Sequence, residues 1–309
     1  MATDDNARAS TPWSVYPLVA LAVFLFSVSP ILVRLASDAP ALSIAGMRTV
    51  FAALVVFPVA LVRRRAELAG FNWRDWLLIT VAGILLALHF IFWIKALYFT
   101  SVSSASVLVA SSPIVLAILS YVFLKERLSR VVIFSIIGGV AGAVLLGIGD
   151  RDAEMSVSNP VLGNALALSA ACFFSVYFVI GRVVRQKVSW LGYVGPLYLV
   201  VALTSACVLW IDGSPILGFE PRIYLLCLVM GLGPQIVGHG SFNYAVKYLS
   251  PTLLGLFGLM EPVGSTLYAW ILFSEVPSLL SFAGTGILLL SVGVALRATG
   301  RRGRQDTTA

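Results

Sequence analysis

Charged residues are scarce in this sequence, and their scarcity excludes most classes of soluble protein. Only 11% of the 309 residues are Asp, Glu, Lys or Arg, whereas 59% are hydrophobic and the mean hydropathy is +0.97. A soluble globular domain has roughly 25% charged residues. The composition therefore indicates a helical protein that crosses a membrane several times and has little mass left for a separate soluble domain.

Motifs for nucleotide, metal and disulfide chemistry are also missing. The three cysteines, Cys172, Cys207 and Cys227, are scattered in apolar runs without a Cys-x-x-Cys pair, which argues against a disulfide framework or a metal cluster. No Gly-x-x-x-x-Gly-Lys, Gly-x-Ser-x-Gly or His-Glu-x-x-His motif occurs. We therefore expect no cofactor, no resident metal and no enzymatic activity. An intramembrane enzyme and a non-transporting assembly protein are the alternatives from other functional classes.

Ten apolar runs alternate with short polar breaks along the chain. Their approximate ranges are 16–36, 43–62, 76–98, 102–122, 131–149, 161–183, 191–211, 223–246, 251–273 and 280–297. Runs of about 20 apolar residues are long enough to cross a bilayer as helices, and these runs lack the alternation of membrane-barrel strands. The sequence therefore predicts ten transmembrane helices.

The basic residues indicate how these helices are oriented. Sixteen Lys and Arg residues fall in the breaks on one side and five on the other. By the positive-inside rule, both termini are expected in the cytoplasm, with the chain in a cell membrane such as the bacterial inner membrane. The net charge of +7 is then a topology signal, and we expect no nucleic-acid partner.

The two halves of the sequence resemble each other. Residues recur at offsets of 148 to 150, and the matching pairs include Phe26 and Phe174, Arg34 and Arg182, His89 and His239, Pro113 and Pro262, and Glu126 and Glu275. Each half holds five predicted spans, an odd number, so the second copy must be inverted relative to the first. The predicted fold class is an all-α membrane protein of ten helices in two inverted five-helix repeats, an architecture used by transporters.

The predicted spans and repeats divide the chain into five parts. Residues 1–15 form a cytoplasmic tail, residues 16–149 the first repeat, residues 150–160 an external loop, residues 161–298 the second repeat and residues 299–309 a second cytoplasmic tail.

Several motifs are similar to those of one family of membrane proteins. They are Ala39-Pro40 leading to Arg48, Leu124-Lys125-Glu126-Arg127-Leu128-Ser129, the glycines 138, 139 and 142, Pro234-Gln235-x-x-Gly238-His239, Glu261-Pro262 and Phe273-Ser274-Glu275. On these motifs the chain resembles the drug/metabolite transporter superfamily, in its ten-helix branch with two EamA domains, over roughly residues 15–298. The resemblance implies a basket of ten helices around a central cavity and secondary transport of small organic metabolites, often as export. One departure is Glu275-Val276-Pro277-Ser278, which replaces the Glu-Arg-Leu-Ser of the first half.

Polar residues inside two equivalent spans are the first candidates for substrate binding. Gln235, His239 and Asn243 are spaced i, i+4 and i+8, so an α-helix would place them on one face. His89 and Trp93 lie on the equivalent stripe of span 76–98. Because polar side chains are costly against lipid, we expect the two stripes to face each other across a midplane cavity. The alternative is that these side chains only hold helices together by hydrogen bonds.

Glu261 is the one acidic residue well inside a predicted span, directly before Pro262. A carboxylate at this depth suits either a proton carrier or a counter-charge for a substrate amine. The alternative is a structural hydrogen bond that repairs the helix beside the proline. Ser112 holds the equivalent position in the first repeat and is a further candidate for binding solute, while His239 is the second candidate for proton coupling.

Arg48 and the glycines of the fifth span also allow two interpretations. Arg48 lies five residues into its span, and we expect it to reach the outer interface or to pair with Asp38 rather than to bind an anion. Gly138 and Gly142 permit close helix contact, either inside the chain or in a dimer.

These features together predict a secondary transporter that works by alternating access at a cavity between the repeats. The favoured substrate is an amino-acid-like or amine-bearing solute that is exported, and an uptake permease for a vitamin or nucleotide-like metabolite is the alternative. The expected partners are the solute, the lipid bilayer and a coupled proton or counter-solute, and the sequence leaves the oligomeric state open.

Overall fold

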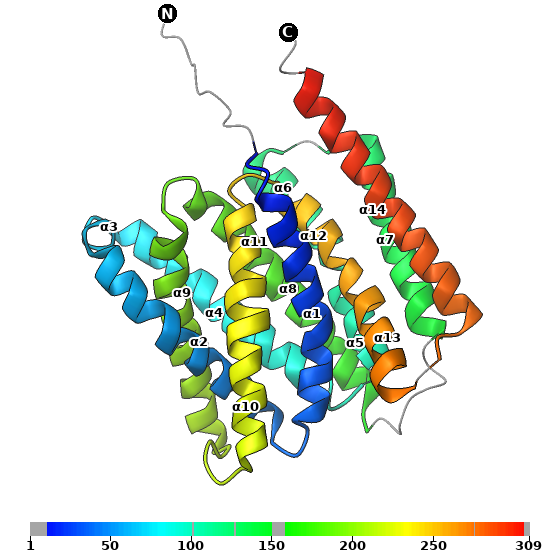
Figure 1. The fold of residues 1–309 in the computed structure, drawn as a ribbon. Helices are drawn as coiled ribbons and strands as arrows, with labels where there is room; N and C mark the ends of the chain where they lie inside the picture. Colours follow the sequence, from blue (N-terminus) through cyan, green and yellow to red (C-terminus); the bar gives the residue numbers. More distant parts are fainter. Residues whose placement is uncertain (1–10, 101, 127, 150–157, 275, 306–309) are drawn as a thin grey trace, which may run out of the picture.

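The computed structural model describes residues 11–100, 102–126, 128–149, 158–274 and 276–305, and every regular element in these ranges is a helix (Figure 1). In chain order the elements are α1 (Val15–Leu35), α2 (Ala41–Arg63), α3 (Arg65–Ala69), α4 (Trp73–Ala96), α5 (Val102–Val109), α6 (Ser112–Leu124), α7 (Arg130–Gly149), α8 (Pro160–Arg185), α9 (Trp190–Asp212), α10 (Pro221–Met230), the π-helix η2 (Gly231–His239), α11 (Gly240–Ala245), α12 (Pro251–Gly258), α13 (Met260–Phe273) and α14 (Leu279–Gln305). Helices form at all ten predicted spans because a bilayer offers backbone groups no partners outside their own segment. Most of the predicted tails and of the 150–160 loop lies outside the described residues.

Eight helical segments of the described chain are long and apolar enough to cross a membrane. The other two predicted spans are also helical but differ in form. Span 131–149 corresponds to α7, whose apolar stretch is the shorter segment Arg130–Leu146. Span 251–273 is divided into α12 and α13. The chain is therefore a multi-pass membrane protein, and its count of ten crossings stays a prediction.

Several helices begin at polar caps that the sequence supplies. The side chain of Asn72 accepts hydrogen bonds from the first turn of α4, and the backbone N–H of Asn72 donates to the carboxylate of Asp75, which completes a capping box. Ser189 and Ser250 cap α9 and α12 through their hydroxyl groups. These caps set where the helices start, and hence the register of the residues further along them.

The two halves of the chain pack against each other in a reciprocal way. The first helix of the first half, α1, packs against η2, α11 and α13, and the first long helix of the second half, α8, packs against α4, α5 and α6. These are equivalent helices with the halves exchanged, as a two-fold relation between the repeats requires. The pair α7 and α14 lies together at one side of the bundle (Figure 1).

Glycines let α7 and α14 approach at backbone distance. A Cβ atom added to Gly142 would lie 2.7 Å from the carbonyl oxygen of Gly284, and one added to Gly138 would lie 2.6 Å from Oγ of Ser291. Both glycines of the small-residue motif therefore serve a contact within the chain, which was one of the two sequence interpretations.

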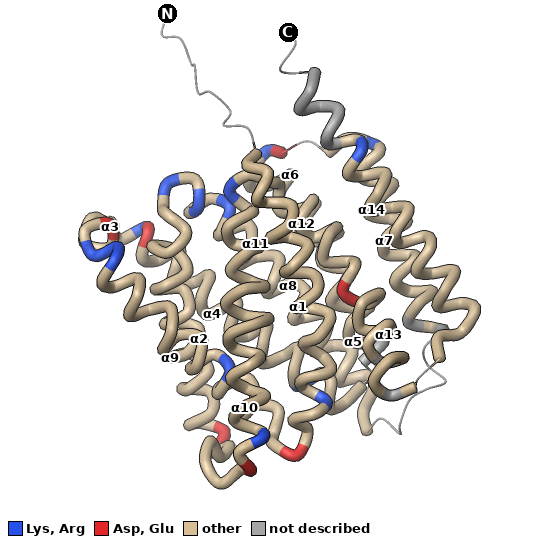
Figure 2. The backbone as a smooth tube through the Cα atoms, viewed as in Figure 1, with Lys and Arg blue, Asp and Glu red and all other residues tan. Residues whose placement is uncertain are grey.

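Basic residues gather at one end of the bundle. Helix α1 begins and α14 ends at the same end of the molecule, and most blue Lys and Arg segments in Figure 2 lie there. An even number of crossings would place the two chain ends in this way.

Candidate functional site

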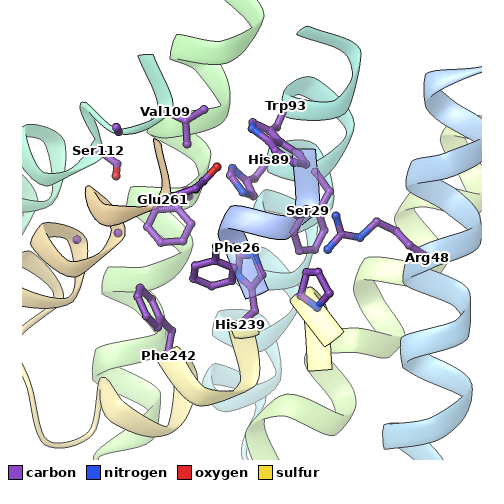
Figure 3. Close-up of a pocket in the computed structure, with 16 residues that line it drawn as sticks. Phe26, Ser29, Arg48, His89, Trp93, Val109, Ser112, His239, Phe242 and Glu261 are labelled. Atoms are coloured by element: carbon purple, nitrogen blue, oxygen red, sulfur yellow. The ribbon is translucent and has the colours of Figure 1, made fainter. Parts of the chain in front are cut away.

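A cavity lies inside the bundle between the two halves of the chain (Figure 3). Its wall is formed from both halves by Phe26, Ser29, Arg48, His89, Phe90, Trp93, Val109, Ala110, Ser112, Phe174, Pro234, His239, Phe242, Gly255, Gly258 and Glu261. Eight of these sixteen residues are aromatic or aliphatic, two are glycines and six carry polar side chains, a combination that suits a pocket for a small organic molecule with polar groups.

Two of the helices that form the wall are interrupted at the cavity. Ala110 and Ser111 separate α5 from α6, and Leu259 separates α12 from α13. Leu259 lies 149 residues after Ala110 and 148 after Ser111, within the offsets of the repeats. Pro113 and Pro262 lie in the first turn of the second half-helix, where a missing N–H costs no hydrogen bond. Interrupted helices free backbone groups at membrane depth, and they are tolerated where they are buried in protein or line a cavity.

The two histidines of the chain meet at this cavity, as the sequence predicts. The ring centroids of His89 and His239 are 6.0 Å apart. Nδ1 of His89 lies 2.9 Å from the carbonyl oxygen of Ala170, and because a carbonyl only accepts, this nitrogen carries the proton. Nδ1 of His239 lies 3.4 Å from the hydroxyl of Tyr177. The Nε2 atom of His89 is then the ring nitrogen left for a solute.

The segment that carries Gln235, His239 and Asn243 is not an α-helix throughout. Residues Gly231–His239 form a π-helix that contains Pro234. His239 lines the cavity, whereas Gln235 and Asn243 are fully buried outside its lining.

Glu261 reaches the cavity with a carboxylate that the protein leaves partly unsatisfied. Its Oε1 atom is buried and has no hydrogen-bond partner among the described residues. Ser265 bonds only the backbone here, donating to the carbonyl oxygens of Glu261 (3.0 Å) and Ser27 (3.1 Å). Among the described residues, Glu261 Oε1 makes no hydrogen bond to the backbone beside Pro262, and the choice between a functional and a structural Glu261 stays open to experiment.

Arg48 is the functional candidate that the sequence interpretation missed. It was expected at the outer interface, but its side chain is 1% exposed and lines the cavity. Its Nε atom donates to Oε1 of Gln235 at 3.3 Å, and its guanidinium carbon lies 4.4 Å from the ring centroid of Phe90. The sequence did contain a signal for Arg48, because a charged residue more than one helical turn inside a predicted span usually has a functional role.

The structure brings most of the candidate residues together. Of the seven proposed from the sequence, the five that line the cavity are His89, Trp93, Ser112, His239 and Glu261. The aromatic part of the wall includes Phe90 and the repeat-matched pair Phe26 and Phe174, which the sequence did not single out as lining because aromatic residues are common throughout such bundles. Solute binding by any of these residues stays a prediction.

Two helical repeats around a central cavity, with interrupted helices at the cavity wall, define a membrane transporter. The chain belongs to the EamA-like transporter family, which matches residues 13–148 and 161–297. The two matched segments coincide with the two halves recognised in the sequence.

Several characterised proteins are similar to this chain. It is 27% identical to the human solute carrier family 35 member G1, over 96% of this chain and 83% of that protein. It is 26% identical to the pseudopaline exporter CntI of Pseudomonas aeruginosa, over 91% of this chain and 95% of the exporter. A probable terminal-alkyne amino-acid exporter of Streptantibioticus cattleyicolor is 25% identical, over 66% of this chain and 67% of that protein.

A solved crystal structure shares the fold. It superposes with a TM-score of 0.73 over 93% of this chain and 98% of the other, at 21% sequence identity.

Proposed function

We propose that this protein is a secondary transporter that exports a small amino-acid-like or amine-bearing metabolite. The solute binds in the cavity between the repeats, which opens alternately to the two sides of the membrane. Ten crossings in two inverted repeats, with both termini in the cytoplasm of a bacterial cell, are part of this proposal.

The observation that carries the proposal is the unpaired carboxylate of Glu261. Its Oε1 atom is buried at the start of the half-helix α13 and has no partner in the described part of the chain, although buried polar atoms are nearly always hydrogen-bonded. A substrate ammonium group would supply the missing donors and the opposite charge. Trp93 and Phe26, also on the wall, offer aromatic faces to the remainder of the solute.

Two relatives support export as the direction of transport. One is named an exporter of pseudopaline and the other a probable exporter of a terminal-alkyne amino acid. The proposed orientation rests on the excess of Lys and Arg at the end of the bundle where α1 begins (Figure 2).

Coupling to protons is the second element of the proposal. Glu261 and His239 line the same cavity, and both side-chain types exchange protons. A proton that neutralises Glu261 competes with a substrate ammonium for the same carboxylate, so the two bind in alternation and an inward proton gradient drives the solute outward.

The test uses the purified protein in liposomes of defined orientation. Efflux of labelled amino acids and simple amines is measured with and without an imposed pH gradient, alongside vitamins and nucleosides. Glu261→Gln keeps the size of the side chain and removes its charge, so we expect about a tenfold or greater loss of amine-solute efflux. Glu220→Gln, at an exposed position, is the matched control and should transport like the wild type.

Three outcomes would contradict parts of the proposal. Wild-type efflux by Glu261→Gln would remove this residue from the site. Net uptake driven by the same gradient, or transport confined to vitamins or nucleosides, would favour the uptake alternative. Efflux that does not respond to the pH gradient would exclude proton coupling and favour exchange with a counter-solute.

A further inference from the structure

Arg48 places a buried positive charge on the wall of the cavity, opposite Glu261. It comes from α2 of the first repeat, and its side chain is 1% exposed. Figure 3 shows Arg48 and Glu261 entering from opposite sides, with Phe26 and His89 between them. Among the lining residues, Arg48 is the basic one and Glu261 the acidic one.

The hydrogen-bond donors of Arg48 are mostly unused. A guanidinium group has five N–H donors, and Nε donates to Gln235. Among the described residues, no acceptor bonds its two terminal nitrogens and no carboxylate lies within 4.0 Å of them. The Nε2 donor of Gln235 is buried beside it and is also without a partner. The site therefore has an excess of donors and a positive charge that protein groups do not balance.

The surroundings hold this donor set in place. The guanidinium carbon lies over the Phe90 ring, 4.4 Å from its centroid, a cation–π contact that uses no N–H donor in a hydrogen bond. Gln235 is anchored in turn, because the hydroxyl of Tyr198 donates to its backbone carbonyl at 2.6 Å. A Cβ atom on Gly231 would lie 2.7 Å from the carbonyl oxygen of Arg48, so η2 and α2 are in backbone contact. The subsite thus joins both repeats.

We infer that Arg48, positioned by Gln235, is the binding subsite for a carboxylate group of the transported solute. Planar guanidinium donors match the two oxygens of a carboxylate, and burial strengthens the pairing. Together with a substrate amine at Glu261, which is the part that rests on the proposed function, this subsite selects zwitterions: solutes that carry both a carboxylate and an ammonium group.

The structure also argues against a purely structural Arg48. A buried cation that only held helices together would be expected to use its terminal nitrogens on backbone carbonyls, as Arg185 does. Nε of Arg185 donates to the carbonyl oxygen of Asn243 at 2.9 Å, and its Nη1 bonds that of Val188. Arg48 lacks such contacts and faces the cavity instead.

The test compares solutes that differ only by a carboxylate. The probes are L-leucine, L-phenylalanine and L-lysine with their decarboxylated amines isoamylamine, phenethylamine and cadaverine, used within a panel of all proteinogenic amino acids and the amines they yield. Binding is measured by thermal shift of the purified protein, and transport is measured as efflux from liposomes. We expect Arg48→Gln to weaken amino-acid binding by about 30-fold or more and to leave binding of the amines within about twofold.

Matched variants separate the effect from misfolding. Arg63→Gln makes the same change at the exposed end of the same helix and should behave like the wild type. Arg48→Lys keeps the charge but loses the planar guanidinium group, so it should weaken amino-acid binding by about tenfold. If Arg48→Gln does not fold, the amino-acid binding of Arg48→Lys tests the inference in its place.

The outcomes distinguish this inference from the proposed function. If the wild type binds the amines as well as the amino acids and neither Arg48 variant changes that, the carboxylate subsite is wrong while amine export stands. If the wild type neither binds nor moves any amino acid or amine in the panel, the proposed function fails and the subsite fails with it. Selective loss of the amino acids in the Arg48 variants supports both.

Discussion

The contact between α7 and α14 allows a sharp prediction about stability. Gly284 on α14 packs against the backbone of α7, and a Cβ atom there would lie 2.5 Å from both the carbonyl oxygen of Gly142 and the amide nitrogen of Leu146. Ordinary contacts begin at 3.4 Å, so Gly284→Ala forces the two helices apart by about 0.9 Å. Neither contact atom belongs to a side chain that can move away.

The magnitude follows from two opposing effects. Overpacking of this kind costs about 1–3 kcal/mol, while alanine gains roughly 1 kcal/mol over glycine in a helix. Gly286→Ala on the same helix isolates the second effect, because a Cβ atom at that position has nothing within 4 Å. The difference in unfolding free energy between the two variants is then the packing cost alone, with Gly284→Ala less stable by about 1–3 kcal/mol.

The assay is unfolding of both variants in the same detergent, followed by heat and by titration with a denaturing detergent. Gly284→Ala should melt well below Gly286→Ala, and Gly286→Ala at or above the wild type. If Gly284→Ala were as stable as Gly286→Ala, the close backbone contact between α7 and α14 would not exist, and the glycines would have to serve another surface.

Two further predictions concern carboxylates outside the membrane spans. Glu67 accepts hydrogen bonds from the backbone nitrogen and the hydroxyl of Ser189, both at 2.6 Å, so Glu67→Ala should cost about 1–3 kcal/mol in the same unfolding assay. Burial raises the pKa of Glu126 above its ordinary 4.5, and Arg182, 3.6 Å away, opposes this rise. The folded state therefore holds the proton of Glu126 more tightly than the unfolded state does. The wild type should lose stability relative to Glu126→Gln as the pH increases above 4.5, as measured by melting temperature against pH.

One exposed residue serves as the control for both carboxylates. Glu220→Ala and Glu220→Gln should leave the melting temperature and its pH dependence close to those of the wild type. A Glu67→Ala protein as stable as Glu220→Ala would refute the docking role of Glu67. A Glu126→Gln protein whose stability follows the wild-type pH profile would refute the pKa argument.

The sequence by itself determined the class of the protein and its division into two repeats. Each apolar run must form a helix, since a membrane offers backbone groups no other partners. Pairs of identical residues at a nearly constant offset, such as His89 and His239, were sufficient to indicate the duplication. They also predicted that equivalent side chains lie close together, and the ring centroids of these two histidines are 6.0 Å apart.

Tertiary structure decided which side chains face the cavity and what they contact there. Lipid is as apolar as a packed protein interior, so hydropathy does not tell which side of a membrane helix is covered by other helices. From the sequence, the glycines of α7 could serve either a contact within the chain or a dimer, and the structure shows them in contact with α14. His239 lines the cavity, whereas Gln235 is buried outside the lining and bonds Arg48, a distinction that residue spacing alone does not reveal. Arg48 was misplaced because its burial and its contact with Gln235, 187 residues away, depend on how the two repeats pack.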